Sequence, residues 1–185
     1  LSNPSDHIQR HLHSTQSFYE LAMLEDIRSR LGGEGGLVID VGANIGNHTL
    51  FFAGVCQCEV IAIEPHPDNL SQLRNTVTLN QLDGKVQIHA TAVGAEANRG
   101  QFHVPDPLNM GRVSISPTEQ GDVEIVPLDE LVAEGENPRV IKIDVEGMEY
   151  DVLRGLSETL KNSQCRLVLC EIHFAVFRER KETNM

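Results

Sequence analysis

The sequence predicts an α/β fold with a Rossmann-like, doubly wound and mostly parallel β-sheet. Three short apolar runs, at residues 37–41, 60–63 and 140–143, are rich in valine and isoleucine and show no helical period. Such runs are typical of strands that are buried on both faces of a parallel sheet. Segments with the 3.6-residue period of amphipathic helices separate the runs, and this alternation places helices on both faces of one sheet.

The first segments of the chain are expected to precede the sheet. Residues 1–17 are polar and are expected to form a solvated N-terminal segment, and residues 18–185 are long enough for a single domain with a proper core. From Phe18 to Leu31 apolar residues recur at helical spacing, which predicts an amphipathic helix. Four glycines within residues 32–36 then indicate where this helix ends.

A glycine-bearing turn follows the first apolar run. Gly42 and Gly46 allow the backbone to turn sharply and to approach a ligand closely, and a helix is expected to begin near Asn47. A strand, turn and helix in this order direct free backbone N–H groups at a bound small molecule. A turn of the same shape with no ligand is the alternative interpretation.

The spacing of the glycines indicates which small molecule binds at this turn. A dinucleotide fingerprint would have glycine where Asn44 stands, and the Gly-Lys-Ser/Thr ending of a phosphate-binding loop is missing. A cofactor with a cationic amino-acid end and an adenosine end fits better, with Asp40 near its ammonium or sulfonium group. The predicted cofactor is therefore S-adenosylmethionine.

Glu64 ends the second apolar run, 22 residues beyond Gly42. In a doubly wound sheet an acidic residue at this place accepts hydrogen bonds from both ribose hydroxyls. The alternative is a surface carboxylate that caps the next helix, since Pro67 and Asp68 resemble a helix start. After the next predicted strand, at residues 86–90, a turn of small residues that includes Ala92 and Val93 could form the floor of an adenine site.

Residues 95–127 are expected to form an inserted β-rich region. They contain glycine, proline and short alternating apolar pieces, which predict a small β hairpin or ribbon. A loop inserted over the ligand-binding edge of a sheet usually shapes a substrate pocket. An ordinary exposed hairpin is the alternative.

The run at residues 140–143 ends at Asp144, and a turn with Glu146 follows. Across the switch point from the first strand, Asp144 should face the reactive end of the cofactor. Two carboxylates there can orient a hydroxyl substrate, take its proton or share a metal ion, although Glu146 could instead cap the helix predicted after it. His173, at the end of the last predicted strand, is a further candidate base, with a structural role as its alternative.

The composition of the chain excludes several classes of binding partner. Fifteen basic and 27 acidic residues give a formal charge of −12, which disfavours nucleic acid binding. No apolar run is long enough to span a membrane, and no secretory signal is visible. The four cysteines lack the usual zinc spacing, so no metal site is predicted, and reduced thiols indicate a cytoplasmic protein.

Taken together, these motifs resemble the FkbM-type methyltransferases. The resemblance rests on Phe18-Tyr19-Glu20, on residues 38–46 (VIDVGANIG), on Ile63-Glu64-Pro65, on Ala92-Val93-Gly94, on residues 141–147 (IKIDVEG) and on Glu171-Ile172-His173. It implies a class I methyltransferase fold, here with a shortened C-terminal end, and O-methylation of a hydroxyl on a sugar or small metabolite. A nicotinamide-dependent oxidoreductase and a non-catalytic cofactor-binding module are the alternatives.

Two groups of residues are therefore expected to form the site. The expected cofactor-binding residues are Asp40, Gly42, Ala43, Asn44, Gly46, Glu64, Pro65, Ala92 and Val93. The expected catalytic residues are Asp144, Glu146 and His173.

Overall fold

The computed structural model describes residues 7–103, 113–162 and 164–172. Its main sheet has five parallel strands in the order β3-β2-β1-β8-β9. The strands are β1 (Leu37–Val41), β2 (Glu59–Ile63), β3 (Val86–His89), β8 (Pro138–Ile143) and β9 (Leu167–Cys170). The order reverses between β1 and β8, so the predicted doubly wound parallel sheet is confirmed, with its switch point between these two strands.

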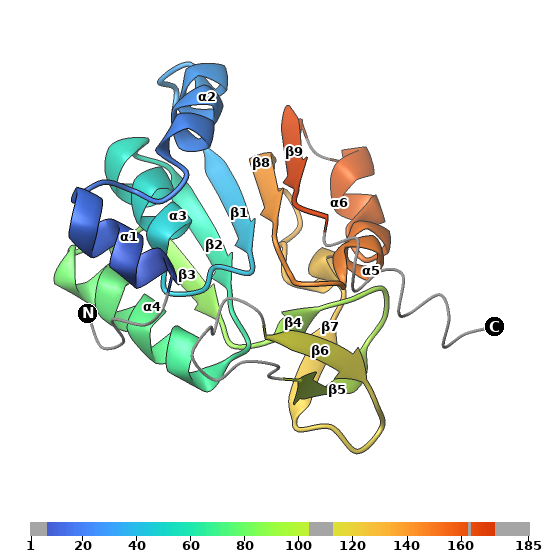
Figure 1. Ribbon diagram of the computed structural model, residues 1–185. Helices are drawn as coiled ribbons and strands as arrows, with labels where there is room; N and C mark the ends of the chain where they lie inside the picture. The colour runs from blue at the N-terminus through green and yellow to red at the C-terminus, as the bar shows by residue number, and fades with distance from the viewer. Residues whose placement is uncertain (1–6, 104–112, 163, 173–185) are drawn as a thin grey trace.

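Successive residues of each central strand point to opposite faces of the sheet, and both faces are covered (Figure 1). Val38 packs in the core cluster that includes the buried residues of α2, whereas Ile39 packs with Val152 and Leu156 on the other face. The helices of the first face are α2 (Leu21–Leu31), α3 (Asn47–Leu50), the π turn Phe51–Val55 and α4 (Pro67–Leu79). Within the described ranges no helix is long and apolar enough to cross a membrane.

A second, four-stranded sheet lies beyond the carboxyl ends of the main strands (Figure 1). Its strands are β4 (Ala92–Val93), β5 (Asn98–His103), β6 (Ser114–Pro117) and β7 (Val123–Val126), in the order β4-β7-β5-β6. β5 and β6 form the predicted antiparallel hairpin. Ala92 and Val93, expected in a turn, instead form a strand that pairs in parallel with β7.

Residues 7–15 of the N-terminal segment, which was expected to be solvated, form a helix with one side packed on the domain. Helix α1 (His7–Thr15) buries Gln9, whose amide donates to the Gln72 side chain of α4 at 2.9 Å. The rings of His7 and His11 lie edge-on to Tyr19 at centroid distances of 5.3 and 5.5 Å. These contacts on one side of the helix hold it against the domain.

The helix expected after Asp144 is broken into α5 (Glu149–Arg154) and α6 (Ser157–Asn162). At Gly155, between them, a Cβ atom would lie 2.0 Å from the Gly94 carbonyl oxygen, so the backbones touch here. The Asp129 carboxylate accepts hydrogen bonds from two backbone N–H groups in the first turn of α6. Leu153 of α5 and Leu160 of α6 are 38% and 37% exposed, so neither is buried in the core.

Candidate functional site

A cavity opens at the switch point, where the carboxyl ends of β1, β2 and β8 meet the second sheet. It contains about 640 Å³ of empty space, a value that includes the solvent at its open mouth. Eight of the residues predicted for the site line it: Gly42, Asn44, Glu64, Pro65, Ala92, Val93, Asp144 and Glu146. β5 and β6 add the apolar side chains of Phe102 and Ile115 to its wall.

Gly42 begins the turn after β1 in a conformation that other residues rarely adopt. Its φ is +80°, and a Cβ atom there would lie 1.8 Å from the Asp144 carbonyl oxygen. The backbone N–H groups of Gly42 and Ala43 both donate to the Ile63 carbonyl at 3.0 Å, which fixes the turn to the end of β2. Only glycine therefore allows the turns after β1 and β8 to approach this closely.

Glu64 lies at the end of β2 and is 5% exposed. Its carboxylate accepts hydrogen bonds from the backbone N–H of Asn44 at 2.9 Å and from that of His66 at 2.8 Å. Burial raises the pKa of this carboxyl group to about 7, although the two backbone hydrogen bonds act in the opposite direction. Each carboxylate oxygen keeps further acceptor capacity for a ligand.

Two buried polar atoms lie on the same side of the cavity as Glu64. Asn69 is 4% exposed, and its Oδ1 has no hydrogen-bond partner among the described residues; the same is true of Nδ1 of His66. Both residues line the cavity, and the His66 ring lies edge-on to Phe102 at a centroid distance of 5.0 Å. Burial lowers the pKa of His66, which favours its neutral form. A flat ligand with polar ring atoms suits this wall.

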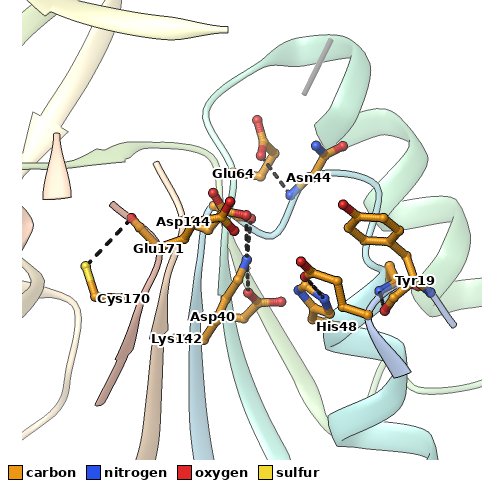
Figure 2. A network of polar contacts seen from close by, with 12 residues as sticks. Tyr19, Asp40, Asn44, His48, Glu64, Lys142, Asp144, Cys170 and Glu171 are labelled. Atoms are coloured by element: carbon orange, nitrogen blue, oxygen red, sulfur yellow. Dashed lines mark hydrogen bonds and ion pairs between the residues drawn. The ribbon is translucent and has the colours of Figure 1, made fainter. Parts of the chain in front are cut away.

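A buried polar network lies beside the cavity, on the face of the sheet covered by α3. Figure 2 shows the Lys142 ammonium between the carboxylates of Asp40 and Asp144. Lys142 Nζ is 3.2 Å from Asp40 Oδ1, 3.6 Å from Asp144 Oδ2, and 3.1 Å from the Gly42 carbonyl oxygen to which it donates. Burial lowers the pKa of Lys142, but the neighbouring carboxylates outweigh it and raise the pKa above its ordinary value.

The segment before α2 also reaches this region. The side-chain amide of Asn47 accepts from the Tyr19 N–H and donates to the Tyr19 carbonyl, both at 3.1 Å. Glu20, with φ +57°, places its carboxylate 3.3 Å from His48 Nε2, and this contact lowers the pKa of Glu20. Burial, followed by the charges of Glu20, Glu171 and Asp144, raises the pKa of Tyr19, so its hydroxyl faces the acidic side of the site.

Some predicted site residues lie elsewhere. Asp40 is fully buried beneath the turn, where it also accepts from the Thr49 hydroxyl at 2.7 Å, and it does not line the cavity. Ala43 lies in the core, and Gly46 allows α3 to pack on α4, since a Cβ atom there would lie 2.8 Å from Leu73 Cδ1. His173 is outside the described residues. Contact of these residues with a ligand stays a prediction.

Lys142 and the Tyr19–Glu20 segment belong to this region without having been predicted as site residues. A charged residue inside an otherwise apolar buried strand was the available signal for Lys142.

A family model and two curated methyltransferases match this chain. Residues 40–184 match the family model described as the methyltransferase FkbM domain. The chain is 31% identical over 177 residues to the hexuronic acid methyltransferase AglP of Haloferax volcanii, with 88% of this chain and 70% of that protein covered. It is 27% identical over 146 residues to methyltransferase 1 of Beauveria bassiana, with 65% of this chain and 58% of that protein covered. Among solved structures, the N-terminal domain of human METTL16 in complex with SAH aligns with a TM-score of 0.46 at 15% identity, covering 89% of this chain and 58% of that one.

Proposed function

This chain belongs to the FkbM methyltransferase family, and from that premise we propose that it transfers a methyl group from S-adenosylmethionine to a hydroxyl oxygen of a saccharide. The observation that carries the proposal is the single cavity that Gly42, Glu64 and Asp144 line together. Family membership also favours methyl transfer over the oxidoreductase and the non-catalytic module that the sequence left open.

The groups on the Glu64 side of the cavity fit an adenosine. The Glu64 carboxylate accepts two backbone hydrogen bonds and interacts with the Asn69 side chain, and its remaining acceptor capacity suits a ribose hydroxyl. Asn69 Oδ1 and His66 Nδ1 offer buried polar atoms to an adenine ring, and Phe102 offers an apolar wall. The glycine at position 42 removes the side chain that would otherwise keep a ligand from the backbone.

Asp144 is the residue proposed to act on the acceptor. S-adenosylmethionine supplies an already activated methyl group when it is bound. Asp144, with a side chain 29% exposed at the cavity, would orient the acceptor hydroxyl and receive its proton as the oxygen–methyl bond forms. Alignment of the reacting groups can supply up to ~7–11 kcal/mol, and a base typically adds a factor of ~10² to 10⁴. Glu146, in the same turn, is the second carboxylate proposed at the acceptor.

Hexuronic acid is the acceptor class named for the Haloferax volcanii relative, and it supports a saccharide acceptor for this chain. The hydroxyl-rich surface of a sugar suits the polar groups near Asp144. They include the Tyr19 hydroxyl, whose pKa is raised by burial and then by the charges of Glu20, Glu171 and Asp144.

Calorimetry with S-adenosylhomocysteine and with NAD tests the cofactor. We expect the wild-type protein to bind only S-adenosylhomocysteine, and Glu64→Gln to weaken that binding ~10- to 100-fold, because hydrogen bonds to a charged acceptor are lost. Glu59→Gln is a matched control, since Glu59 is an exposed glutamate at the other end of β2. Binding of NAD, or an unchanged affinity in Glu64→Gln, would overturn the cofactor assignment.

Methyl transfer to hexuronic acids and their glycosides, followed by mass spectrometry, tests the reaction. Asp144→Asn should lower turnover by a factor of ~10² to 10⁴ while binding of S-adenosylhomocysteine persists, because the amide keeps the shape but cannot take the proton. Methylation of a nitrogen or carbon atom instead of a hydroxyl oxygen would show that O-methylation is wrong.

A further inference from the structure

Lys142 occupies a position in β8 that the surrounding sequence would assign to an apolar residue. It lies directly opposite Asp40 of β1 in the strand register and is 3% exposed. Val140, two residues earlier on the same face, packs in the apolar core. A lysine is rarely buried unless it is paired, so its partners indicate why it is there.

Lys142 has more polar partners than the one carboxylate that is needed to neutralise its charge. A single carboxylate, Asp40, neutralises one ammonium, and Asp40 is itself held by the Thr49 hydroxyl at 2.7 Å. Beyond this pair, the Lys142 ammonium donates to the Gly42 carbonyl at 3.1 Å and forms a second, longer ion pair with Asp144 Oδ2 at 3.6 Å. Lys142 therefore contacts both turns that form the mouth of the cavity.

In the proposed function, one of these turns contacts the cofactor and the other contacts the acceptor. The inference rests on that proposed function. Gly42 belongs to the turn proposed to approach the cofactor, and Asp144 is proposed to receive the acceptor hydroxyl. We propose that Lys142 is a positioning residue: anchored by Asp40, it holds the Asp144 carboxylate at the Gly42 turn and so aligns the acceptor with the cofactor.

A neutral replacement of the buried pair separates positioning from a structural role. Lys142→Met alone would leave the Asp40 carboxylate buried without its counter-charge and could unfold the chain. The double variant Asp40→Asn with Lys142→Met removes both charges at similar volume. If Lys142 only neutralised Asp40, this variant would fold, bind S-adenosylhomocysteine and methylate at the wild-type rate.

The positioning role predicts another result for the same variant. We expect a melting temperature near that of the wild type, with kcat at saturating cofactor ~100-fold lower, because a small misplacement of a reacting group costs about this much. In an Asp144→Asn background the paired replacement should cause no further loss, since Lys142 acts through Asp144. Glu158→Gln with Lys161→Met, an exposed ion pair in α6, is the matched control and should leave kcat unchanged.

A crystal structure of Asp40→Asn with Lys142→Met, bound to S-adenosylhomocysteine, tests the inference without any acceptor. The Asp144 carboxylate should turn away from the Gly42 turn or lose its single orientation. Wild-type turnover in the paired variant, an additive loss in the Asp144→Asn background, or an unmoved Asp144 would each overturn the positioning role. Failure of the wild-type protein to bind S-adenosylhomocysteine would instead overturn the proposed function.

Discussion

Glu64 is a carboxyl group whose surroundings oppose its ionisation. Burial at the end of β2 raises its pKa to about 7, so it is mostly protonated at pH 5 and mostly ionised at pH 8. Hydroxyl groups donate more strongly to a carboxylate than to a carboxylic acid. The proposed ribose contact should therefore strengthen as the pH rises through 7.

The same group makes the stability of the ligand-free fold depend on pH. Between pH 4.5, the ordinary value for glutamate, and about 7, folded Glu64 keeps a proton that the unfolded chain releases. Its contribution to the free energy of unfolding is complete below pH 4.5 and is lost as the pH rises through about 7, at most ~3 kcal/mol. Glu64→Gln lacks this loss. The melting temperature of the variant minus that of the wild type should therefore increase from pH 5 to pH 8.

Thermal unfolding of both proteins across this pH range is the measurement. Glu59→Gln, which removes an exposed carboxylate of the same strand, should keep a constant difference from the wild type. Parallel curves for Glu64→Gln and the wild type would contradict the raised pKa.

The positions of some site residues could be predicted from the sequence, and those of others could not. Glu64 and Asp144 could be placed because carboxyl ends of parallel strands share one edge of the sheet, and the structure puts both residues at one cavity. The neighbours of Lys142 depend on the register of β8 against β1, which no local pattern encodes. Asp40 is predicted at the cofactor, and the alternation of β1 turns its side chain toward α3, beneath the turn.

At the scale of elements, the turn after β1 is the most constrained connection of the described fold. Gly42→Ala would add a Cβ atom 1.8 Å from the Asp144 carbonyl oxygen at a φ of +80°. Because the neighbour is backbone, it cannot move aside, and we expect a loss of more than ~2 kcal/mol in the free energy of unfolding. Urea denaturation gives this value directly.

Gly84→Ala is the control for that substitution. Gly84 lies between α4 and β3, and nothing is within 4 Å of the position that its Cβ atom would take. Its replacement should change the free energy of unfolding by no more than ~0.5 kcal/mol. Equal losses for the two variants would show that the contact between the turns is not a packing constraint.

Strands and helices were predictable to different degrees for a physical reason. A strand buried on both faces shows a continuous apolar run, so β1, β2 and β8 were visible in the sequence. The break between α5 and α6 depends on the contact of Gly155 with the Gly94 carbonyl, in a segment distant in the chain. β4 likewise exists because Ala92 and Val93 pair with Ile125 and Val126, which their own residues do not indicate.

At the scale of the whole molecule, the site lies where two kinds of sheet meet. The apolar clusters on the two faces of the main sheet hold its strands rigidly, and a third cluster holds the second sheet through Ile115 and Ile125. The alternation of strands and helices predicted the first sheet. The second was predicted only as a hairpin, because its order joins segments that are not neighbours in the sequence.

Net charge acts on the whole molecule as well. With a formal charge of −12, self-repulsion is stronger in the compact state than in the unfolded chain. Raising NaCl from 0.01 to 0.15 M shortens the screening length from ~30 Å to ~8 Å and weakens this repulsion. The exposed ion pairs, such as Arg30–Asp26 and Lys161–Glu158, are also screened, but each contributes little.

We therefore expect salt to stabilise the protein at pH 8, by about 1 kcal/mol or ~2–4 °C in melting temperature. Near pH 5, the isoelectric point of the sequence, the net charge passes through zero and the same salt should have almost no effect. Differential scanning calorimetry at the two pH values and two NaCl concentrations measures both. A melting temperature that falls with salt at pH 8 would mean that attractive pairs outweigh the excess of acidic residues.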